Sequence, residues 1–536
     1  MNKDVTEAGL VENFVSKLLK KKNPDDLIAQ SKKDGLTKTL TAFDLIVLGI
    51  SAVIGSGIFV MIGSAALGTS DHIGAGPSLV VSIVLAAIAC IFPALCYAEF
   101  ASMIPVAGSA YTYTFATMGE LAAWMIGWIL MLEYAIGNIT VASSWTGYVF
   151  QLLQGFSKWL PSWLVNPPLW LVNDYSSACV KYASMGLDPA HEIPKLFGFI
   201  PFCLNVPAIF IILFLASVLT KGTKESTKMA TVMVLTKLAV IALFVIVGAF
   251  YVKPSNWVPF APNGLSGIVL GAFVIFYAYI GFDAISTAAE ETKNPQKDLP
   301  IGLIGSLILC SIIYGIVALV FTGLIPYGSN VDMHAPIAYA MRLVHQDNVA
   351  GLISIGALAG LTSVLLVLQY GTTRILYAMT RDNFFPSVMK KMHPKYNTPY
   401  VITWSTAILV VIGSLFMDMN VAAELCIFGT FTSFIIVCVG VLILRKTDPG
   451  RERPFKVPFC PWFPILGIVI CGYLMISAMK DLQTSALLFP VWLLVGVIIY
   501  FSYGYQKNRR VEANEKNAKQ VSEQNVAEGQ TQEIIL

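Results

Sequence analysis

The sequence predicts an all-α membrane protein with about twelve transmembrane helices. Of its 536 residues 56% are hydrophobic and only 12% are charged, whereas about a quarter of the residues in soluble domains are charged. A bilayer core of roughly 30 Å needs about 20 mostly apolar residues per helix, and such runs recur from residue 42 to residue 503. The predicted spans are 42–66, 77–103, 119–150, 206–220, 227–251, 267–287, 300–325, 350–377, 399–417, 421–444, 463–480 and 486–503.

The distribution of basic residues predicts the orientation of these spans. Segments on the N-terminal side of the membrane carry 28 of the 35 Lys and Arg residues, six lie on the other side, and Lys237 falls within a span. Cytoplasmic segments are enriched in positive charge, so both termini are predicted to be cytoplasmic. No apolar stretch opens the chain, so the first span is expected to act as the insertion signal.

Three regions are expected along the chain. Residues 1–40 form a cytoplasmic N-terminal tail, residues 41–505 a transmembrane domain with a long outer loop at 151–205, and residues 506–536 a disordered cytoplasmic tail rich in polar residues. The nine cysteines lack metal-type spacing, so neither a metal nor a cofactor is expected. Cys179 and Cys203 share the outer loop, and the sequence leaves open whether they form a disulfide.

Glycine placement distinguishes the first and sixth spans from the others. Gly55 and Gly57 flank Ser56 near the middle of the first span, and Gly281 precedes Phe282 and Asp283 in the sixth. Each pattern predicts a helix interrupted at bilayer depth. The interruptions lie five spans apart and therefore run in opposite directions, as a five-plus-five inverted repeat requires. Spans 11 and 12 are then an addition.

Interrupted helices expose backbone groups that must be buried in protein or line a cavity. Free N–H groups at the start of the second half-helix of span 1 suit a carboxylate, and free carbonyls ending the first half-helix of span 6 suit an ammonium group. A zwitterionic α-amino acid presents both charges. The alternative is that these glycines only allow close helix packing. The predicted substrate-binding residues are Ile54, Gly55, Ser56, Gly57, Tyr277, Ala278 and Ile280.

Four motifs in order, covering most of the chain, carry a family resemblance. The sequence contains LTAFDLIVLGISAVIGSGIF, CYAEFASMIPVAGSAYTYTFATMGE, FYAYIGFDAISTAAEETKNPQKDLP and RILYAMTRDNFFP. It thereby resembles the amino acid-polyamine-organocation superfamily, specifically bacterial members similar to cationic amino acid transporters. The resemblance implies the inverted repeat, alternating access, amino acid binding by the first and sixth spans, and an aromatic gate at Tyr277. It leaves open whether the substrate is cationic or neutral.

Lys237 lies about two turns into the fifth span, where a charge is costly unless paired or neutralised. Desolvation favours the neutral amine, so this side chain is expected to gain and lose a proton. In proton-coupled members of the superfamily that the chain resembles, a lysine at the matching place occupies the Na⁺ position of sodium-coupled relatives. Thr362 and Ser363 of the eighth span are its expected hydroxyl partners. A lysine permanently paired to hold helices together is the alternative.

Acidic residues within or beside the spans have less specific roles. Glu133 and Asp283 are candidates for proton relay or gating, and Glu99 for an inner gate or a helix contact. Glu290 and Glu291 lie at the inner surface near lysines, and solvated pairing is expected there.

The predicted function is secondary active amino acid transport, coupled to protons and working by alternating access in the cell (inner) membrane of a bacterium. The partners are then an amino acid, protons and the bilayer. A net charge of +3 gives no indication of nucleic acid binding. No GxxxxGK[ST], HExxH or GxSxG motif indicates an enzyme or an ATP-driven pump. An exchanger, or an amino acid sensor on a transporter fold, remains an alternative.

Overall fold

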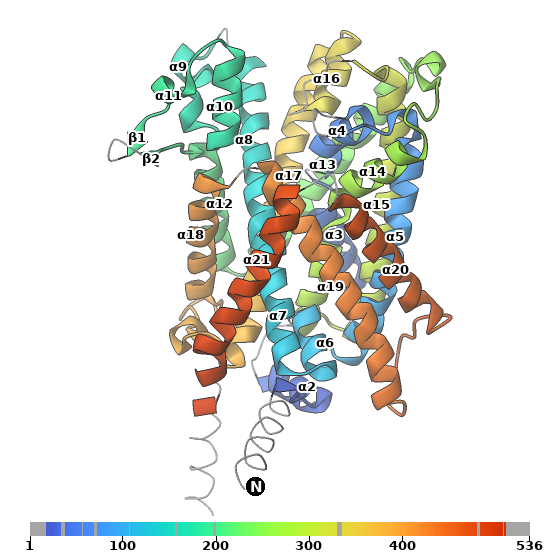
Figure 1. Ribbon diagram of the computed structural model, residues 1–536, viewed down its shortest axis with the longest axis vertical. Coiled ribbons are helices and arrows are strands. Elements are labelled where there is room, and N and C mark those ends of the chain that lie inside the picture. The colour runs from blue at the N-terminus through green and yellow to red at the C-terminus, as the bar shows by residue number, and fades with distance from the viewer. Residues whose placement is uncertain are drawn as a thin grey trace, which may run out of the picture.

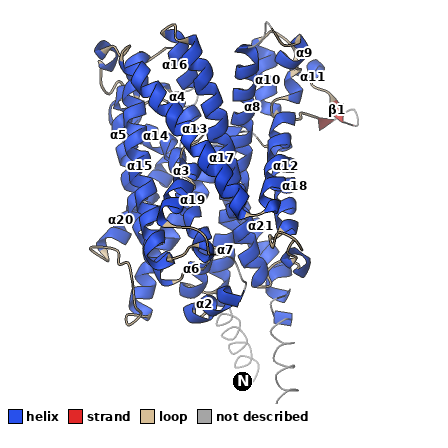
Figure 2. Cartoon of the chain, turned by 180° about the vertical axis from the view of Figure 1, so that it is seen from behind, coloured by secondary structure: helices blue, strands red, loops and turns tan. Residues whose placement is uncertain are grey.

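The computed structural model describes residues 18–33, 38–55, 57–68, 72–106, 108–155, 159–196, 200–329, 335–417, 419–479, 483–507 and 509–510. Long helices run side by side along one axis (Figure 1), and the described chain is helical apart from loops and one small two-stranded sheet (Figure 2). The fold is therefore all-helical, as predicted.

Among the described residues, nine helical segments are long and apolar enough to cross a membrane. Three further apolar helices are shorter. Each of these segments overlaps one of the predicted spans. The long helices are α3 (Ala42–Val53) with η1 (Gly57–Met61) and α4 (Ile62–Leu67), α5 (Leu79–Met103), α7 (Glu120–Met131) with η3 (Leu132–Ile136) and α8 (Gly137–Gly155), α13 (Thr223–Ala249), α14 (Gly264–Phe276) with η6 (Tyr277–Tyr279) and η7 (Phe282–Glu291), α15 (Pro295–Leu324), α17 (Asp347–Arg381), α19 (Met419–Thr447), and α21 (Gln483–Ile499) with η9 (Tyr500–Gly504); the shorter ones are α12 (Val206–Lys221), α18 (Tyr400–Phe416) and α20 (Trp462–Ala478).

Burial separates central from peripheral helices. The most apolar windows of the segments that begin with α3, α7, α14 and α17 are 82%, 89%, 78% and 72% buried, whereas that of the segment that begins with α21 is 22% buried. A helix that is apolar on all sides and largely buried belongs at the centre of a bundle. These four segments therefore form the core of the bundle, and α21 lies at its periphery.

Short elements join the long helices. They are η2 (Gly76–Ser78), α6 (Ala110–Thr117), η5 (Pro254–Trp257), α16 (Pro336–Leu343) and η8 (Ser387–Lys390), and, between α8 and α12, α9 (Ser162–Val165), η4 (Leu169–Leu171), α10 (Tyr175–Ser184), α11 (Pro189–Glu192), β1 (Lys195–Leu196) and β2 (Ile200–Pro201). The latter group lies above α12 in Figure 1, at the end of the bundle opposite α6. We call that end the far face.

Cys179 and Cys203 both belong to this far-face group. They are free thiols and pack in one small hydrophobic cluster with Ala178, Tyr182 and Ile193. The structure thus brings the two cysteines into one cluster without a disulfide.

The predicted N-terminal tail contributes a helix of its own, α2 (Pro24–Lys33), which lies beneath α6 and α7 (Figure 1). Its Leu27 is only 2% exposed. Residues 1–17 and 34–37, and the predicted disordered tail from residue 511 onward, lie outside the described residues.

Candidate functional site

The first long segment is interrupted where the glycines predicted. Helix α3 begins at a capping box formed by Thr41 and Asp44 and ends at Val53, and Ile54 is extended, with φ −78° and ψ 100°. The π-helix η1 begins at Gly57. Ser56, between them, lies outside the described residues. This confirms the interruption, and π-helical turns of this kind are frequent at functional sites.

The sixth segment is interrupted in a comparable way. Helix α14 gives way to the 3₁₀ turn η6, and Ile280 is extended, with φ −59° and ψ 137°. Gly281 then adopts φ +100°, a left-handed conformation that glycine reaches at little cost. The chain continues as the 3₁₀ helix η7 rather than as the expected α-helix.

The two interruptions contact each other. A Cβ atom on Gly57 would lie 2.2 Å from the Cα atom of Ala278, so only glycine allows this approach. The hydroxyl of Tyr314, on α15, lies 2.7 Å from the carbonyl oxygen of Val53 and 2.9 Å from that of Ala278. Tyr314 therefore links the ends of both broken helices, a role that nothing in the sequence indicated.

A small cavity of about 10 Å³ lies between the interruptions. That is room for about one water molecule, so a solute requires the site to widen. No charged side chain lines it. The lining residues are Ala52, Val53, Gly57, Gly137, Val141, Tyr277, Ile280, Val364, Leu368 and Cys426.

Some of the predicted binding residues line the cavity. Gly57, Tyr277 and Ile280 line it. Ala278 lies directly behind, against Gly57. The carbonyl of Tyr277 already accepts a hydrogen bond from the backbone N–H of Ile280, at 3.3 Å. Gly55 packs against Val364, and Ile54 turns its carbonyl toward Lys237.

The amine of Lys237 lies completely buried beside the first interruption. Its nitrogen is 3.0, 3.1 and 2.6 Å from the carbonyl oxygens of Ile50, Ser51 and Ile54, and 2.9 Å from the hydroxyl of Ser363. Three of these oxygens belong to the C-terminal end of α3, where the helix dipole is negative. The pocket therefore suits a cation and contains no carboxylate among the described partners.

Of the two expected hydroxyl partners of Lys237, only Ser363 contacts its amine in the structure. Ser363 contacts the amine and also lies 3.2 Å from the carbonyl of Ser51. Thr362 instead accepts a hydrogen bond from the indole of Trp145 at 3.0 Å and donates to the carbonyl of Leu358. Neighbouring residues point to different sides of a helix, and α17 turns only Ser363 toward Lys237.

Two buried acids, Glu133 and Asp283, form a polar pair on the other side of the breaks. Both are completely buried and interact electrostatically. Asp283 accepts a hydrogen bond from the hydroxyl of Tyr134, but its other oxygen and both oxygens of Glu133 lack hydrogen-bond partners among the described residues. Thr430 and Ser433 of α19 lie close to Glu133 without forming such bonds.

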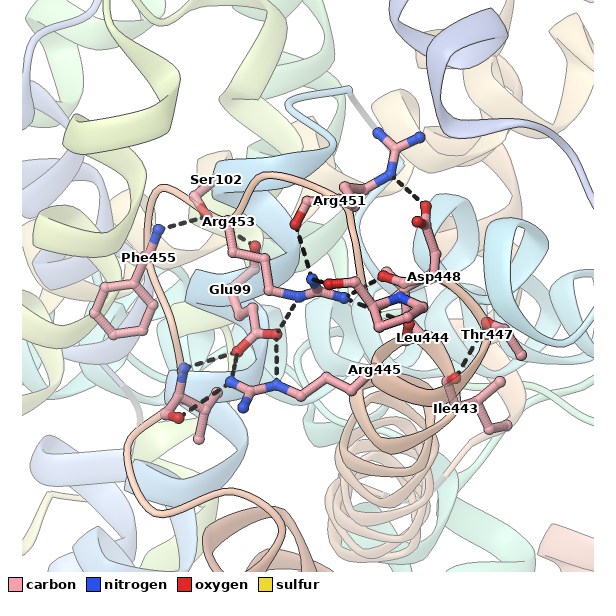
Figure 3. Close-up of polar contacts among 12 residues, drawn as sticks. Glu99, Ser102, Ile443, Leu444, Arg445, Thr447, Asp448, Arg451, Arg453 and Phe455 are labelled. Atoms are coloured by element: carbon pink, nitrogen blue, oxygen red, sulfur yellow. Dashed lines mark hydrogen bonds and ion pairs between the residues drawn. The ribbon is translucent and has the colours of Figure 1, made fainter.

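Glu99 has a different environment from these two acids. Its carboxylate accepts hydrogen bonds from Arg445 at 3.0 and 2.5 Å and from the backbone N–H of Val457 at 2.7 Å, and forms an ion pair with Arg453 (Figure 3). These contacts connect α5 to the end of α19 and to the segment between α19 and α20, and Glu99 is not among the residues that line the cavity.

Glu290 and Glu291 correct an expectation from the sequence. They are 7% and 3% exposed rather than solvated. Glu291 pairs with Arg374, and Glu290 pairs with Arg381 at 3.4 Å. Both arginines belong to α17, so the prediction of solvated pairing with nearby lysines was wrong: folding brings in a helix that is distant in sequence.

Known proteins resemble this chain along most of its length. Residues 40–501 match the amino acid permease family. The chain is 42% identical over 489 residues to a methylthioribose transporter of Bacillus subtilis (strain 168), covering 91% of this chain and 98% of the relative. It is 41% identical over 494 residues to the branched-chain amino acid permease BcaP of the same organism, covering 92% and 98%.

A plant protein extends the range of relatives. The chain is 36% identical over 434 residues to the chloroplastic cationic amino acid transporter 9 of Arabidopsis thaliana, covering 81% of this chain and 71% of the relative. With these similarities and its long apolar helices, the chain is a multi-pass membrane transporter for an amino acid or a related solute, not an enzyme. It belongs to the amino acid permease family.

Proposed function

We propose that the protein imports amino acids together with protons by alternating access. The observation that carries the proposal is the amine of Lys237, buried among three carbonyl oxygens at the end of α3 and the hydroxyl of Ser363 on α17, without a carboxylate partner among the described residues. An oxygen cage of this kind suits a cation, and an amine can fill or vacate that role by gaining or losing a proton.

The proposal includes an architecture of twelve spans with a five-plus-five inverted repeat and two added helices. Its support is the contact between the two interruptions at Gly57 and Ala278, because half-helix ends that meet at mid-depth are typical of such repeats. Both termini are then cytoplasmic, the far face is extracellular, and the membrane is that of a bacterial cell.

The substrate proposed is a neutral amino acid with a small aliphatic side chain. Its carboxylate lies at the amides of residues 55–57 and its ammonium at the carbonyls of the sixth-span interruption. The side chain then contacts apolar groups such as Val141, Val364 and Leu368. A cationic side chain would meet no acid among the lining residues, and two relatives carry the name branched-chain amino acid permease.

A neutral thio-sugar is a second candidate substrate, because the methylthioribose transporter of Bacillus subtilis (strain 168) is 42% identical to this chain. Such a solute carries no charge and would use the free backbone groups of the interruptions as uncharged hydrogen-bond partners. Neither substrate requires a charged side chain in the cavity.

The transport cycle follows from these assignments. With the far face open, the Lys237 amine is protonated and the solute binds between the interruptions, beneath Tyr277. Closure of the far face and opening of the opposite one then connect Lys237 to the cytoplasm, to which it releases its proton before or with the solute. Glu133 and Asp283 are proposed to accept protons on that path, and Glu99 to act as a helix contact.

Uptake into proteoliposomes tests the proposal. Liposomes that contain the purified protein are given radiolabelled leucine, lysine or methylthioribose, with and without an inward proton gradient. Gradient-driven accumulation of leucine is expected. Accumulation only when the liposomes are preloaded with amino acid would identify an exchanger, and binding without uptake would identify a sensor. Preferred accumulation of methylthioribose would replace the amino acid assignment.

A further inference from the structure

A second and much larger cavity lies at the far face, away from the interruptions. Its volume is about 660 Å³. It is enclosed by the end of α8, the start of α12 and the elements between them. We call it the α10 pocket; its lining residues include Thr146, Gly147, Phe150, Asp174, Lys181 and Asn205.

This pocket is separate from the central cavity. Both contact α8, but Gly137 and Val141 line the central cavity whereas Gly147 and Phe150 line the α10 pocket. At about 100° per residue, Phe150 lies on the opposite side of the helix from Val141. A ligand in the α10 pocket therefore does not share the central site.

Asp174 supplies a buried negative charge to the pocket. It is 5% exposed, and its two oxygens accept hydrogen bonds from the backbone N–H and the hydroxyl of Ser177. Among the described residues no cation forms an ion pair with it. Asp174 is the N-cap of α10, whose positive helix end offsets part of the cost of burying the carboxylate, and each oxygen retains the capacity to accept a hydrogen bond from an ammonium group.

Asn205 supplies a donor. It is 2% exposed, and its side-chain oxygen accepts from the hydroxyl of Thr146 at 2.6 Å and from the backbone N–H of Ala208 at 3.2 Å. The N–H of Ala208 can only donate, so the amide orientation is fixed. The NH₂ group of Asn205 has no partner among the described residues and belongs to a side chain that lines the pocket.

Lys181 adds positive charge to the same wall. Its amine donates to the side-chain oxygen of Asn173 at 2.7 Å, and its positive charge attracts an anionic group. The α10 pocket thus combines a buried carboxylate with a cation and an amide donor.

From these groups we infer that the α10 pocket binds a zwitterion that carries a primary ammonium and an acidic oxygen. Its ammonium contacts Asp174, and its carboxylate or phosphate contacts Lys181 and Asn205. Two sources offer this chemistry: a free amino acid and the headgroup of an aminophospholipid. Val206 and Phe210 of α12, which follow Asn205 in the chain, are exposed, as apolar side chains that face lipid would be.

Equilibrium binding to the delipidated full-length protein tests this inference, with leucine and glycerophosphoethanolamine as separate probes. Asp174→Asn removes the charge but keeps a side chain that can cap α10, and Lys181→Gln removes the cation. Asp188→Asn and Lys195→Gln are matched controls, because both residues lie on the same loop outside the pocket lining. Gly147→Leu is a third variant, since a Cβ atom there meets nothing within 4 Å and the side chain would fill the pocket.

The expected result is saturable binding of at least one probe at a site that the three pocket variants weaken about tenfold or more and the controls leave unchanged. Under the proposed function, wild type is expected to bind two leucine molecules, one at the central site and one in the α10 pocket, and the pocket variants are expected to bind one. Binding of only the headgroup assigns the pocket to lipid, and binding of only leucine assigns it to free amino acid. Equal binding by wild type and all three variants, or no saturable pocket binding of either probe, overturns the inference. Uptake by the variants reports separately on the central site and on folding.

Discussion

The amine nitrogen of Lys237 lies 2.6 Å from the carbonyl oxygen of Ile54. Ile54 is the extended residue that caps the end of α3, so the position of the amine is linked to the interruption that also borders the central cavity. Any movement that opens the first span therefore changes the oxygens available to Lys237. This is the physical connection through which solute binding and protonation can influence each other.

Gly57→Ala is expected to reduce transport more than tenfold, because the new Cβ atom would lie 2.2 Å from the backbone of Ala278. Separating the interruptions is also expected to cost about 1–3 kcal/mol of stability through overpacking. Initial uptake rate and thermal unfolding measure the two effects. Gly315→Ala is the control, since its Cβ atom would meet nothing within 4 Å; a Gly57 variant as active as this control would contradict the close approach.

Tyr314→Phe is expected to weaken solute binding about fivefold. The hydroxyl lies between the carbonyls of Val53 and Ala278, and losing a hydrogen bond costs about 1 kcal/mol. Solute binding to the purified variant measures the effect. Tyr473→Phe provides the comparison, because Tyr473 is 58% exposed on α20. If both variants bind as wild type does, Tyr314 does not hold the interruptions in register.

The Lys22→Ala variant is expected to open more often at the face opposite the far face. Lys22 pairs with Asp382 and lies 4.7 Å from the centre of the Phe115 ring, and the Tyr111 hydroxyl donates to the same aspartate at 2.6 Å. Loss of a partly exposed ion pair is worth up to about 1 kcal/mol, so opening increases at most about fivefold.

Alkylation of Cys426 measures this opening, because the thiol is buried and lines the central cavity. N-ethylmaleimide is expected to modify Cys426 faster in the Lys22 variant than in wild type. The exposed Lys293 gives the matched control, Lys293→Ala. Equal rates in all three proteins would show that the Lys22 contact does not restrain this face.

Alkylation of Cys203 is expected to depend strongly on pH. Burial, followed by the neighbouring Cys179, raises the pKa of the Cys203 thiol to about 11. The thiolate is the reactive form, so most of the thiol is unreactive at pH 8 and its reaction with iodoacetamide accelerates as the pH rises toward 11. Mass spectrometry of the Cys203 peptide gives the rates. Recovery of the peptide joined to that of Cys179 under non-reducing conditions would contradict the free thiols.

Features encoded locally could be predicted from the sequence. Runs of apolar residues gave the twelve helical segments, and Gly55, Gly57 and Gly281 marked both interruptions because few other residues tolerate such conformations or contacts. Lys237 was conspicuous because a lysine within a span is rare. Each of these inferences needed only neighbouring residues and the physics of the bilayer.

Contacts between distant segments could not be predicted in this way. The position of Tyr314 between the two interruptions depends on how α15 packs against them. The choice of Ser363 over Thr362 depends on the rotation of α17 about its axis. Glu291 meets Arg374 across 83 residues. The residues of such pairs lie far apart along the chain, and a single sequence contains no signal that they meet.

Proton-driven uptake by Lys237→Ala tests the central claim most directly. Wild type, this variant and the exposed-lysine control Lys253→Ala are reconstituted into liposomes, and accumulation of radiolabelled leucine is followed with and without an inward proton gradient. The account predicts that wild type and the control concentrate leucine when the gradient is present, whereas Lys237→Ala still exchanges leucine but no longer concentrates it. Undiminished gradient-driven accumulation by Lys237→Ala, or a requirement for Na⁺ in wild type, would contradict the account.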